Sequence, residues 1–554
     1  MSTIEFSNLK RKDTIAQLKK EHFDLVVIGG GITGGGIALD AASRGLKVAL
    51  VEKNDFASGT SSKSTKLIHG GLRYLKQFDF WLVKEVGSER AIVHKLAPHL
   101  VLPEKMLLPL IENGSYGKWL TSIGLKVYDI LAQVTGEDKR KMLEKKEALK
   151  LEPLLPKKIL KGAGYYAEYR TDDARLTIEN IKTSLQFGAT ALNYASVTDF
   201  IYKDKTIAGV AVKDELSGKT FTINAKYVIS AAGPWVDELR SVNNSKKGKR
   251  LHLTKGVHLV FPKEKLPVKQ SVYFDIPDGR MMFAIPRGKV TYVGTTDTNF
   301  NLDKDNVRTD LADAIYLLSA VNNMFPKINL EMEDIVSSWA GLRPLIHEEG
   351  KSASELSRKD EIFTSDTGLI SIAGGKLTGY RKMAERVVDR IAKMLEEDHQ
   401  KELKPCTTDK IPLCGNEFKK FKHVKKYITA IYERIQIDGF SEHDAWFLVT
   451  NYGKQTETVL ELYSKRKETD NATKLILAEL QFGIAYEMVQ DPMDFFIRRT
   501  GRLYFDIDSV RQFMEPVLQE FQVVYKVDDA QILQWKETLM AELEEHSNFS
   551  MERV

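Results

Sequence analysis

The sequence predicts an α/β protein in which two sheets are built from interleaved stretches of chain, followed by an all-α domain. Three observations support this prediction. A strand-helix-strand pattern starts at Phe23, and similar apolar runs ending in small residues recur at 227–233 and 369–375. After Lys404 a linker rich in proline and glycine leads into a helical pattern that continues to the end.

Composition excludes several classes of protein. The 554 residues are 43% hydrophobic and 28% charged, as in ordinary globular proteins, and no run of 18 apolar residues suggests a membrane-spanning helix. The net charge of +5 is too small to indicate a nucleic-acid-binding protein. Cys406 and Cys414 lack the spacing of a disulfide framework or a metal site, so we expect no metal and a reducing, cytoplasmic compartment.

A glycine-rich turn opens the first helix. Residues 23–53 read FDLVVIGGGITGGGIALDAASRGLKVALVEK, in which Gly29 allows a tight turn, Gly31 a close approach of backbone to a diphosphate, and Gly34 close helix-strand packing. Glu52 stands 18 residues after Gly34, at the end of the second strand, where a carboxylate can accept hydrogen bonds from ribose hydroxyls. The pattern predicts a Rossmann-like dinucleotide site.

The stretch after the second strand favours one dinucleotide over the others. An acidic residue at Glu52 disfavours the 2′-phosphate of NADP, but NAD and FAD share this turn. The stretch 57–75, rich in Ser, Thr and Gly, offers hydroxyls and backbone N–H groups suited to a flavin, which favours FAD over a merely solvated loop.

A second sheet is expected from segments such as 251–261, 281–285 and 289–294, which are rich in β-branched and aromatic residues. We therefore expect a polar lead at 1–22, an interleaved catalytic body at 23–403 and a helical domain at 404–554. The expected pieces are 23–95, 160–250 and 335–400 for the dinucleotide domain and 96–159 and 251–334 for the substrate domain.

Several sequence blocks resemble those of the FAD-dependent, quinone-reducing glycerol-3-phosphate dehydrogenases, in the same order and over nearly the whole chain. They are SSKSTKLIHGGLRYL at 61–75, AAGPWVDEL at 231–239, AGLRPL at 340–345, LSRKDEI at 356–362, GGKLTGYRKMAE at 374–385 and DPMDFFIRRTGRLYFD at 491–506. The resemblance implies a Rossmann-like FAD-binding domain interleaved with a mixed β-sheet substrate domain, and an all-α C-terminal domain. Oxygen-using glycerol-3-phosphate oxidases share most blocks but carry an insertion in the later catalytic region, and the lack of an extended insertion here favours quinone.

The implied reaction is oxidation of sn-glycerol 3-phosphate to dihydroxyacetone phosphate, with hydride transfer from C2 to FAD. A phosphate calls for arginine, and the resemblance places Arg73, Arg343 and Arg358 in the substrate site, with Tyr74 as a hydroxyl donor. His258 is the expected proton acceptor, although a histidine on an apolar strand is often a core residue. Alternatively, Arg343 stabilises the alkoxide and water takes the proton.

Lys376 is expected near the flavin ring, where a cation stabilises negative charge on the reduced ring. The residues expected to bind FAD, from the glycine turn and from the blocks of the resemblance together, are Gly29, Gly31, Gly34, Glu52, Thr60, Ser61, Ser62, Gly70, Gly71, Leu72, Ala232, Gly233, Trp235, Gly375, Lys376, Leu377 and Thr378. In TDDARL, Asp172, Asp173 and Arg175 are interpreted first as structural ion pairs and second as site residues.

A quinone substrate requires contact with the lipid bilayer, so we expect peripheral attachment to the inner face of the cell membrane. The apolar stretch 118–134 beside the lysine-rich 139–161 could form an interfacial helix, or equally a core helix beside a solvated one. The basic run 418–434 is typical of a solvated helix face. A homodimer stays an open alternative.

Two other functions stay open. An amine- or amino-acid-oxidising flavoenzyme would need a site for a carboxylate and an amine, which GLRPL at 341–345 fits poorly. A flavin-dependent RNA-binding protein could use the basic helical C-terminus, but the nearly neutral total charge argues against nucleic acid.

Overall fold

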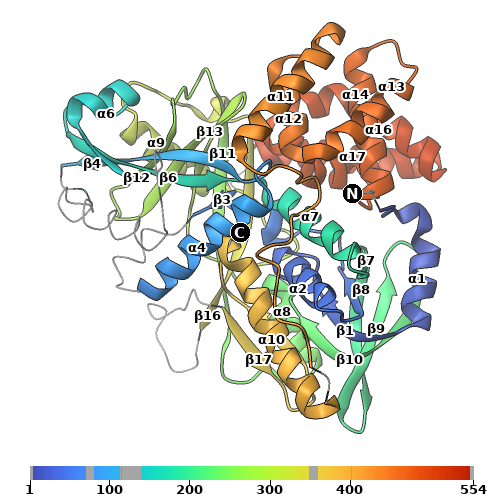
Figure 1. Ribbon diagram of the computed structural model, residues 1–554. Helices are drawn as coiled ribbons and strands as arrows, with labels where there is room; N and C mark the ends of the chain where they lie inside the picture. Colours follow the sequence, from blue (N-terminus) through green and yellow to red (C-terminus); the bar gives the residue numbers. More distant parts are fainter. Residues whose placement is uncertain are drawn as a thin grey trace.

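The computed structural model describes residues 4–69, 80–112, 114, 139–347, 360–400 and 402–549. Figure 1 shows two sheet-containing lobes that share one chain, and a bundle of helices formed by the last quarter of the sequence. This arrangement confirms the predicted fold class. No helix of the described ranges is long and apolar enough to cross a bilayer.

The first sheet has eight strands among the described residues. They are β1 (His22–Ile28), β2 (Val48–Val51), β7 (Thr190–Leu192), β8 (Ala195–Lys203), β9 (Thr206–Asp214), β10 (Thr220–Ser230), β17 (Glu361–Thr364) and β18 (Ile370–Ala373). Their order is β17-β18-β10-β1-β2-β7, with β9 paired to β10 and β8 paired to β9. Strands β18, β10, β1, β2 and β7 run parallel, as a Rossmann-like sheet requires.

Helix α2, which is rich in glycine and alanine, packs closely against α7 and α10 beside this sheet. The interhelical packing depends on glycine, because a Cβ at Gly35 would lie 3.1 Å from Ile181 and a Cβ at Gly36 would lie 3.1 Å from the Tyr380 ring. The helices around the first sheet are α1 (Arg11–Lys20), α2 (Ile32–Ser43), α7 (Asp173–Leu185), α8 (Val236–Val242) and α10 (Tyr380–His399), with the short turns η1 (Asn8–Lys10), η2 (Thr60–Ser62), η4 (Gly233–Trp235) and η7 (Leu377–Gly379).

The second sheet has ten strands in the described part of the chain, most of them antiparallel. They are β3 (Leu67–Ile68), β4 (Leu102–Ile111), β5 (Lys141–Glu144), β6 (Leu160–Arg170), β11 (Arg250–Pro262), β12 (Ser271–Asp275), β13 (Met281–Arg287), β14 (Val290–Gly294), β15 (Thr298–Asn299) and β16 (Ser337–His347). The elements that lie between strands of this sheet along the chain are helices α4 (Phe80–Leu96), α6 (Lys145–Leu151) and α9 (Leu311–Met324) and the turn η5 (Met332–Asp334).

Three strands of this sheet differ from the expected partition. Strand β3 lies in the piece 23–95, strand β6 in the piece 160–250 and strand β16 in the piece 335–400, all expected in the dinucleotide domain, yet all three belong to the second sheet. The reason is long-range pairing: β16 pairs with β11 from Ser337 opposite Val260 to His347 opposite Arg250, and β6 pairs with β4 over nearly its whole length. The chain therefore leaves the second sheet later than expected after β6 and after β16, and it first enters that sheet earlier than expected, at β3.

The C-terminal domain is helical, as predicted. Its elements are α11 (Phe421–Ile435), η8 (Gln436–Asp438), α12 (Glu442–Tyr452), η9 (Gly453–Gln455), α13 (Thr456–Lys465), α14 (Asn471–Tyr486), the π-helix η10 (Asp494–Arg499), α15 (Arg502–Phe505), α16 (Ile507–Tyr525) and α17 (Asp529–Ser547). The segment around η10 and α15 packs against the catalytic body: buried Asp55, in the loop after β2, pairs with Arg498 and Arg499.

Candidate active site

The glycine-rich turn joins β1 to α2. Gly29 has φ +113°, a conformation that favours glycine, and its N–H donates to Val51 O at 2.8 Å. A Cβ at Gly34 would lie 1.8 Å from the carbonyl oxygen of Gly29, so this residue must also be glycine. The helix therefore starts close against the sheet, with the N–H groups of its first turn at the mouth of the turn.

Glu52 lies beside this turn, directly after β2. Its Oε2 accepts a hydrogen bond from Gly30 N at 2.6 Å, and its Oε1 accepts one from Asn54 N at 3.0 Å. Burial raises the pKa of Glu52, while the two backbone N–H donors act in the opposite direction. A carboxylate fixed next to a helix N-terminus matches the donor and acceptor pattern of a nucleotide ribose.

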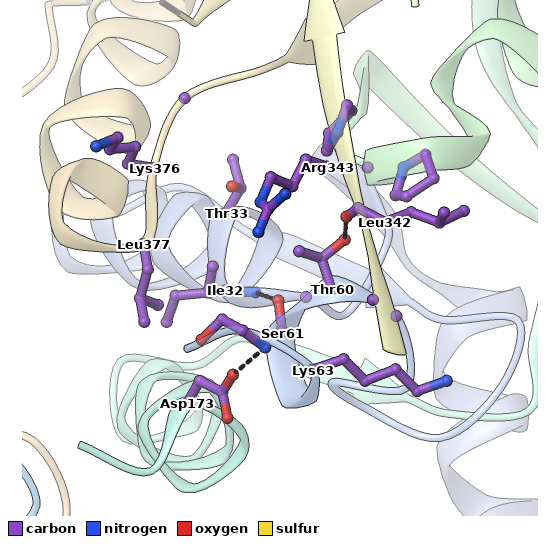
Figure 2. A pocket seen from close by; sticks show the side chains of 18 of the residues that line it. Ile32, Thr33, Thr60, Ser61, Lys63, Asp173, Leu342, Arg343, Lys376 and Leu377 are labelled. Carbon is purple, nitrogen blue, oxygen red and sulfur yellow. Dashed lines mark hydrogen bonds between the residues drawn. The ribbon is translucent and has the colours of Figure 1, made fainter. Parts of the chain in front are cut away.

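The segment 60–66 runs from this turn toward the second sheet (Figure 2). Ser61 Oγ accepts a hydrogen bond from Ile32 N at 2.9 Å, and Thr60 Oγ1 donates to Leu342 O at 2.7 Å. Asp173 accepts from Ser64 N at 3.0 Å, which holds the segment against the start of α7. Helices α2 and α7 and strand β16 therefore hold this segment in place.

A cavity of about 540 Å³ lies where these elements meet. It is lined by most of the residues predicted from the sequence that the structure describes: Gly29, Gly31, Glu52, Thr60, Ser61, Ala232, Gly233, Trp235, His258, Arg343, Gly375, Lys376, Leu377 and Thr378.

Two predicted cofactor residues do not line the cavity. Gly34 lies under the first turn of α2, where it allows the close packing described above. Ser62 is buried, with its Oγ donating to Gly59 O at 3.4 Å and its carbonyl accepting from Lys66 Nζ. Both residues therefore support the elements that line the cavity without lining it themselves.

Some of the predicted residues lie outside the described part of the chain. They are Gly70, Gly71, Leu72, Arg73, Tyr74 and Arg358, together with the whole apolar stretch 118–134.

Arg343 projects from β16 into the cavity. Its Nη1 donates to Thr296 O at 2.9 Å and Asp297 Oδ1 at 3.1 Å, and its Nη2 donates to Thr295 Oγ1 at 2.8 Å. The guanidinium passes over Gly256, where a Cβ would lie 2.4 Å from Nη2. These contacts orient a cation that is still 30% exposed, which suits it to bind an anion.

His258 lies on β11 and is 1% exposed. Its ring stacks on Trp339 with centroids 4.7 Å apart and an interplanar angle of 13°, and its Nε2 lies 3.0 Å from Thr65 Oγ1. Burial lowers the pKa of His258 well below its usual value, and the cations Arg343 and Lys66 lower it further. The imidazole is therefore neutral near pH 7 and able to accept a proton.

Lys376 follows two glycines with positive φ, Gly374 at +79° and Gly375 at +80°, and precedes η7. It lines the cavity, but in Figure 2 its side chain points away from Arg343, so the two cations occupy different walls. Nearby, burial lowers the pKa of His69 to about 3, helped by Lys376 and Arg90.

The ion pairs predicted in TDDARL are present. Asp173 pairs with Lys66, Asp172 with Arg287, and Arg175 with Glu179 and Glu487. Asp173 also lines the cavity, so it combines both of its expected roles.

Sequence reasoning missed Thr65, Trp339 and the loop residues Thr295 and Asp297, which contact His258 and Arg343. One signal could have identified Trp339: it lies four residues before Arg343 on one strand, and residues at even spacing share a face. Thr65 and the loop 295–297 come close to His258 and Arg343 only because distant segments of the chain pack together. Their neighbours in the sequence therefore do not indicate a role in the site.

The donor set fits a flavin dinucleotide: a helix N-terminus for the diphosphate, a carboxylate for the ribose, and a glycine-lined wall where Cβ atoms are absent. Comparison with known proteins agrees. A family described as FAD dependent oxidoreductase matches residues 24–381, and the C-terminal domain of alpha-glycerophosphate oxidase matches residues 406–532.

Similar proteins match along nearly the whole chain. The aerobic glycerol-3-phosphate dehydrogenase of Bacillus subtilis is 52% identical over 523 residues, 94% of each chain, and that of Staphylococcus haemolyticus is 47% identical over 551 residues, 99% of this chain and 98% of the other. The crystal structure of the Bacillus halodurans glycerol-3-phosphate dehydrogenase complexed with FAD has a TM-score of 0.84 at 44% identity, covering 99% of both chains.

A more distant structure shows a likeness of fold alone. The L-alpha-glycerophosphate oxidase of Mycoplasma pneumoniae has a TM-score of 0.54 at 21% identity and covers 70% of this chain and 97% of its own. The resemblance seen in the sequence blocks is thus confirmed by the full-length relatives. The chain belongs to the family of FAD-dependent, aerobic glycerol-3-phosphate dehydrogenases.

Proposed function

We propose that this protein oxidises sn-glycerol 3-phosphate to dihydroxyacetone phosphate and delivers the electrons through FAD to a membrane quinone. One observation carries the proposal: Arg343, His258 and Lys376, from three distant stretches, line the same cavity as the dinucleotide turn. When bound, FAD would supply the acceptor for the hydride from C2 of the substrate.

The chain offers groups for each part of the cofactor. The N–H groups at the start of α2 face the place of the diphosphate, and Glu52 would accept hydrogen bonds from a ribose. Lys376 would place a cation on the wall formed by Gly374 and Gly375. The other predicted residues around the cavity are Thr60, Ser61, Ala232, Gly233, Trp235, Leu377 and Thr378.

Arg343 would bind the substrate through charge-assisted hydrogen bonds to its phosphate or its C2 oxygen. His258 would accept the C2 hydroxyl proton at Nε2 by way of the Thr65 hydroxyl, whose oxygen lies 3.0 Å from this nitrogen: Thr65 would pass its own proton to Nε2 and take the proton of the substrate. If Arg343 instead stabilises the C2 oxygen, a water molecule takes the proton and His258 orients the site. The proton and the hydride together account for the two hydrogens that the alcohol loses.

Quinone is the proposed acceptor for two reasons. The chain is 52% identical to a relative named as an aerobic dehydrogenase, and its sequence lacks the extended insertion typical of the oxygen-using oxidases. A quinone dissolved in lipid requires attachment to a membrane surface. Exposed lysines of the stretch 139–161 supply a positive surface around α6, namely Lys139, Lys141, Lys146, Lys150, Lys157, Lys158 and Lys161.

An anaerobic reduction experiment tests the proposal. Purified holoenzyme is mixed without oxygen with glycerol 3-phosphate, or with glycine as a control substrate, and the flavin absorbance is followed. We expect glycerol 3-phosphate alone to bleach the flavin, and a quinone analogue to restore the absorbance faster than oxygen does. Bleaching by glycine, or faster recovery with oxygen, would replace the proposal with an amine-oxidising or oxidase function respectively.

A further inference from the structure

The helical C-terminal domain reaches the back of the catalytic cavity through α15. Ser337 Oγ, at the start of β16, donates to Leu503 O at 3.0 Å, which fixes α15 against that strand. The rings of Tyr504 and Phe505 then pack on Trp339, with centroids 5.3 Å and 5.5 Å away. Two consecutive residues of the C-terminal domain therefore contact the indole that stacks on His258.

Trp339 connects α15 to the proton acceptor. One face of the indole stacks on His258, and its Nε1 donates to Ser64 O at 3.1 Å. The hydroxyl oxygen of the neighbouring Thr65 lies 3.0 Å from His258 Nε2. The position of Trp339 therefore affects the orientation of the imidazole ring. It also affects the position of the segment around Ser64, which carries Thr65, the hydrogen-bond partner of His258.

Lys66 strengthens the same contact from the side. It is 1% exposed, and its Nζ lies 5.7 Å from the centroid of Trp339, 5.6 Å from that of Tyr504 and 5.8 Å from that of Phe505. The ammonium also donates to Asp173 Oδ1 at 2.5 Å and Ser62 O at 2.9 Å. A desolvated cation among aromatic faces attracts all three rings.

We propose that Tyr504 and Phe505 are positioning residues for the reaction, because they hold Trp339 in the stack that orients His258. The inference rests on the proposed function, in which His258 accepts the substrate proton. Neither side chain lines the cavity, so both act through Trp339. The C-terminal domain is then a structural part of the active site.

The aromatic ring of Tyr504 carries this role, and its hydroxyl does not. The buried hydroxyl has no hydrogen-bond partner among the described residues, whereas the ring contacts Trp339 and Lys66. Without the ring, the indole gains room to tilt, and the imidazole stacked on it can tilt with it. Tyr504→Leu should therefore be harmful, and Tyr504→Phe should restore the function.

The experiment compares Tyr504→Leu with Tyr504→Phe and with Phe521→Leu. Phe521 is a buried aromatic of α16 that packs on Tyr525 and Trp535, so its truncation controls for loss of packing in the same domain. Stopped-flow reduction of the holoenzyme by glycerol 3-phosphate gives the limiting rate and the substrate dependence. Histidine labelled with ¹³C in its ring gives an NMR signal for His258, assigned from the spectrum of His258→Gln.

We expect Tyr504→Leu to lower the limiting reduction rate by about 10- to 100-fold, the size of a small misplacement of a catalytic group, with little change in KM. The His258 signal should shift in this variant, because the ring current of Trp339 changes. Both readouts should stay near the wild type in Tyr504→Phe and Phe521→Leu. Phe505→Leu, measured in the same way, replaces Tyr504→Leu if the latter does not fold.

The proposal is overturned if Phe521→Leu slows reduction as much as Tyr504→Leu, or if the His258 signal stays unchanged in Tyr504→Leu. The NMR measurement needs no substrate. A wild-type enzyme that glycerol 3-phosphate does not reduce would therefore refute the proposed function, while the shift of the His258 signal would still report on the stack.

Discussion

Arg343 shows how one side chain can be prepared for an anion before the anion arrives. Its hydrogen bonds to Thr295, Thr296 and Asp297 fix the plane of the guanidinium, and its exposed part faces the cavity. A lysine would keep the charge but could not make these bonds in one plane. Arg343 is therefore the residue whose loss should affect substrate binding most directly.

We expect Arg343→Ala to cost on the order of 2 to 4 kcal/mol in kcat/KM, roughly 30- to 1,000-fold, because a charge-assisted contact to the substrate is lost. The variant should keep its FAD. Steady-state kinetics with glycerol 3-phosphate and the flavin absorbance measure the two quantities. Arg434→Ala, which breaks an exposed pair with Glu457, is the matched control, and equal kinetics in both variants would remove Arg343 from the site.

A second prediction concerns how the rate of flavin reduction depends on pH through His258. Burial, Arg343 and Lys66 hold its pKa well below the usual histidine value of about 6.5, so the ring stays neutral from pH of about 8 down past that value. The limiting rate of flavin reduction should be flat over that range and fall only at lower pH, when the ring becomes protonated. The stability that neutral His258 contributes is likewise present above pH of about 6.5 and is lost as the pH falls, because the unfolded state binds the proton more readily.

His258→Gln should lower the limiting reduction rate by roughly 10²- to 10⁴-fold, the usual contribution of a general base, and should remove this acidic limb. His252→Gln on the same strand, whose ring bonds Asn299 at the surface, is the control. A wild-type rate and pH profile in His258→Gln would identify the residue as part of the core and leave the proton to water.

The residues that could be predicted are those whose role is local in sequence. Gly29, Gly31 and Glu52 follow from the geometry of one strand-helix-strand unit, and the structure places all three at the cavity. Trp339 and Thr65 could not be predicted with equal ease, because their contact with His258 exists only once β16, β11 and the segment 60–66 come together.

At the scale of elements, the junction between the loop after β2 and η10 is held by buried charge. Asp55 Oδ2 accepts from Arg499 Nη1 at 2.7 Å and from Arg498 Nε at 2.5 Å, and its Oδ1 accepts from Arg499 Nη2 at 2.9 Å. These cations lower the pKa of Asp55 to about 2 against the opposing effect of burial. The carboxylate is therefore charged at every pH at which the enzyme would work.

We expect Asp55→Asn to destabilise the holoenzyme by about 3 to 5 kcal/mol, because two buried guanidinium groups lose a counter-charge. The stability that Asp55 contributes is present above its unfolded pKa of about 3.9 and is lost as the pH falls toward 2. Urea unfolding midpoints measure the effect. Asp305→Asn, at an exposed pair with Lys53, should cost at most about 1 kcal/mol, and equal losses in the two variants would contradict this account.

Sheet membership marks the limit of prediction at this scale. The strand-helix-strand unit at the start of the chain is predicted by periodicity and glycine spacing, and the structure has it as β1, α2 and β2. Strands β6 and β16 are expected in pieces of the dinucleotide domain, but belong to the second sheet. The residues of a segment can predict that it forms a strand. Which strand it pairs with depends on residues far along the chain, as for β16 and β11.

At the scale of the whole molecule, two basic surfaces could face a membrane. One is the lysine-rich stretch 139–161 around α6, and the other is the exposed face of α11 with Lys422, Lys425 and Lys426. They lie on different parts of the molecule, the first in the second-sheet lobe and the second in the helical domain (Figure 1). Charge attracts an anionic bilayer only within about a Debye length, so lysine variants of each surface can show which of the two binds the membrane.

We expect the protein to bind vesicles that contain anionic phospholipid, and salt to weaken the binding. Replacing both Lys157 and Lys158 by alanine should weaken it roughly thirtyfold, at about 1 kcal/mol per lysine near the surface. The double alanine variant of Lys425 and Lys426 should bind like the wild type. Co-sedimentation measures both, and the reverse order of the two variants would move the membrane contact to α11.

The strand order of the first sheet also has a consequence for biosynthesis. Strand β1 is complete by residue 28, but β10 beside it ends at residue 230 and β18 follows only at 370–373. During synthesis the glycine-rich turn after β1 therefore leaves the ribosome long before strands β10 and β18, which complete the sheet around it. FAD can therefore bind only late in synthesis. Chains that end before β18 would not retain the cofactor, and cellular proteases and chaperones would act on them.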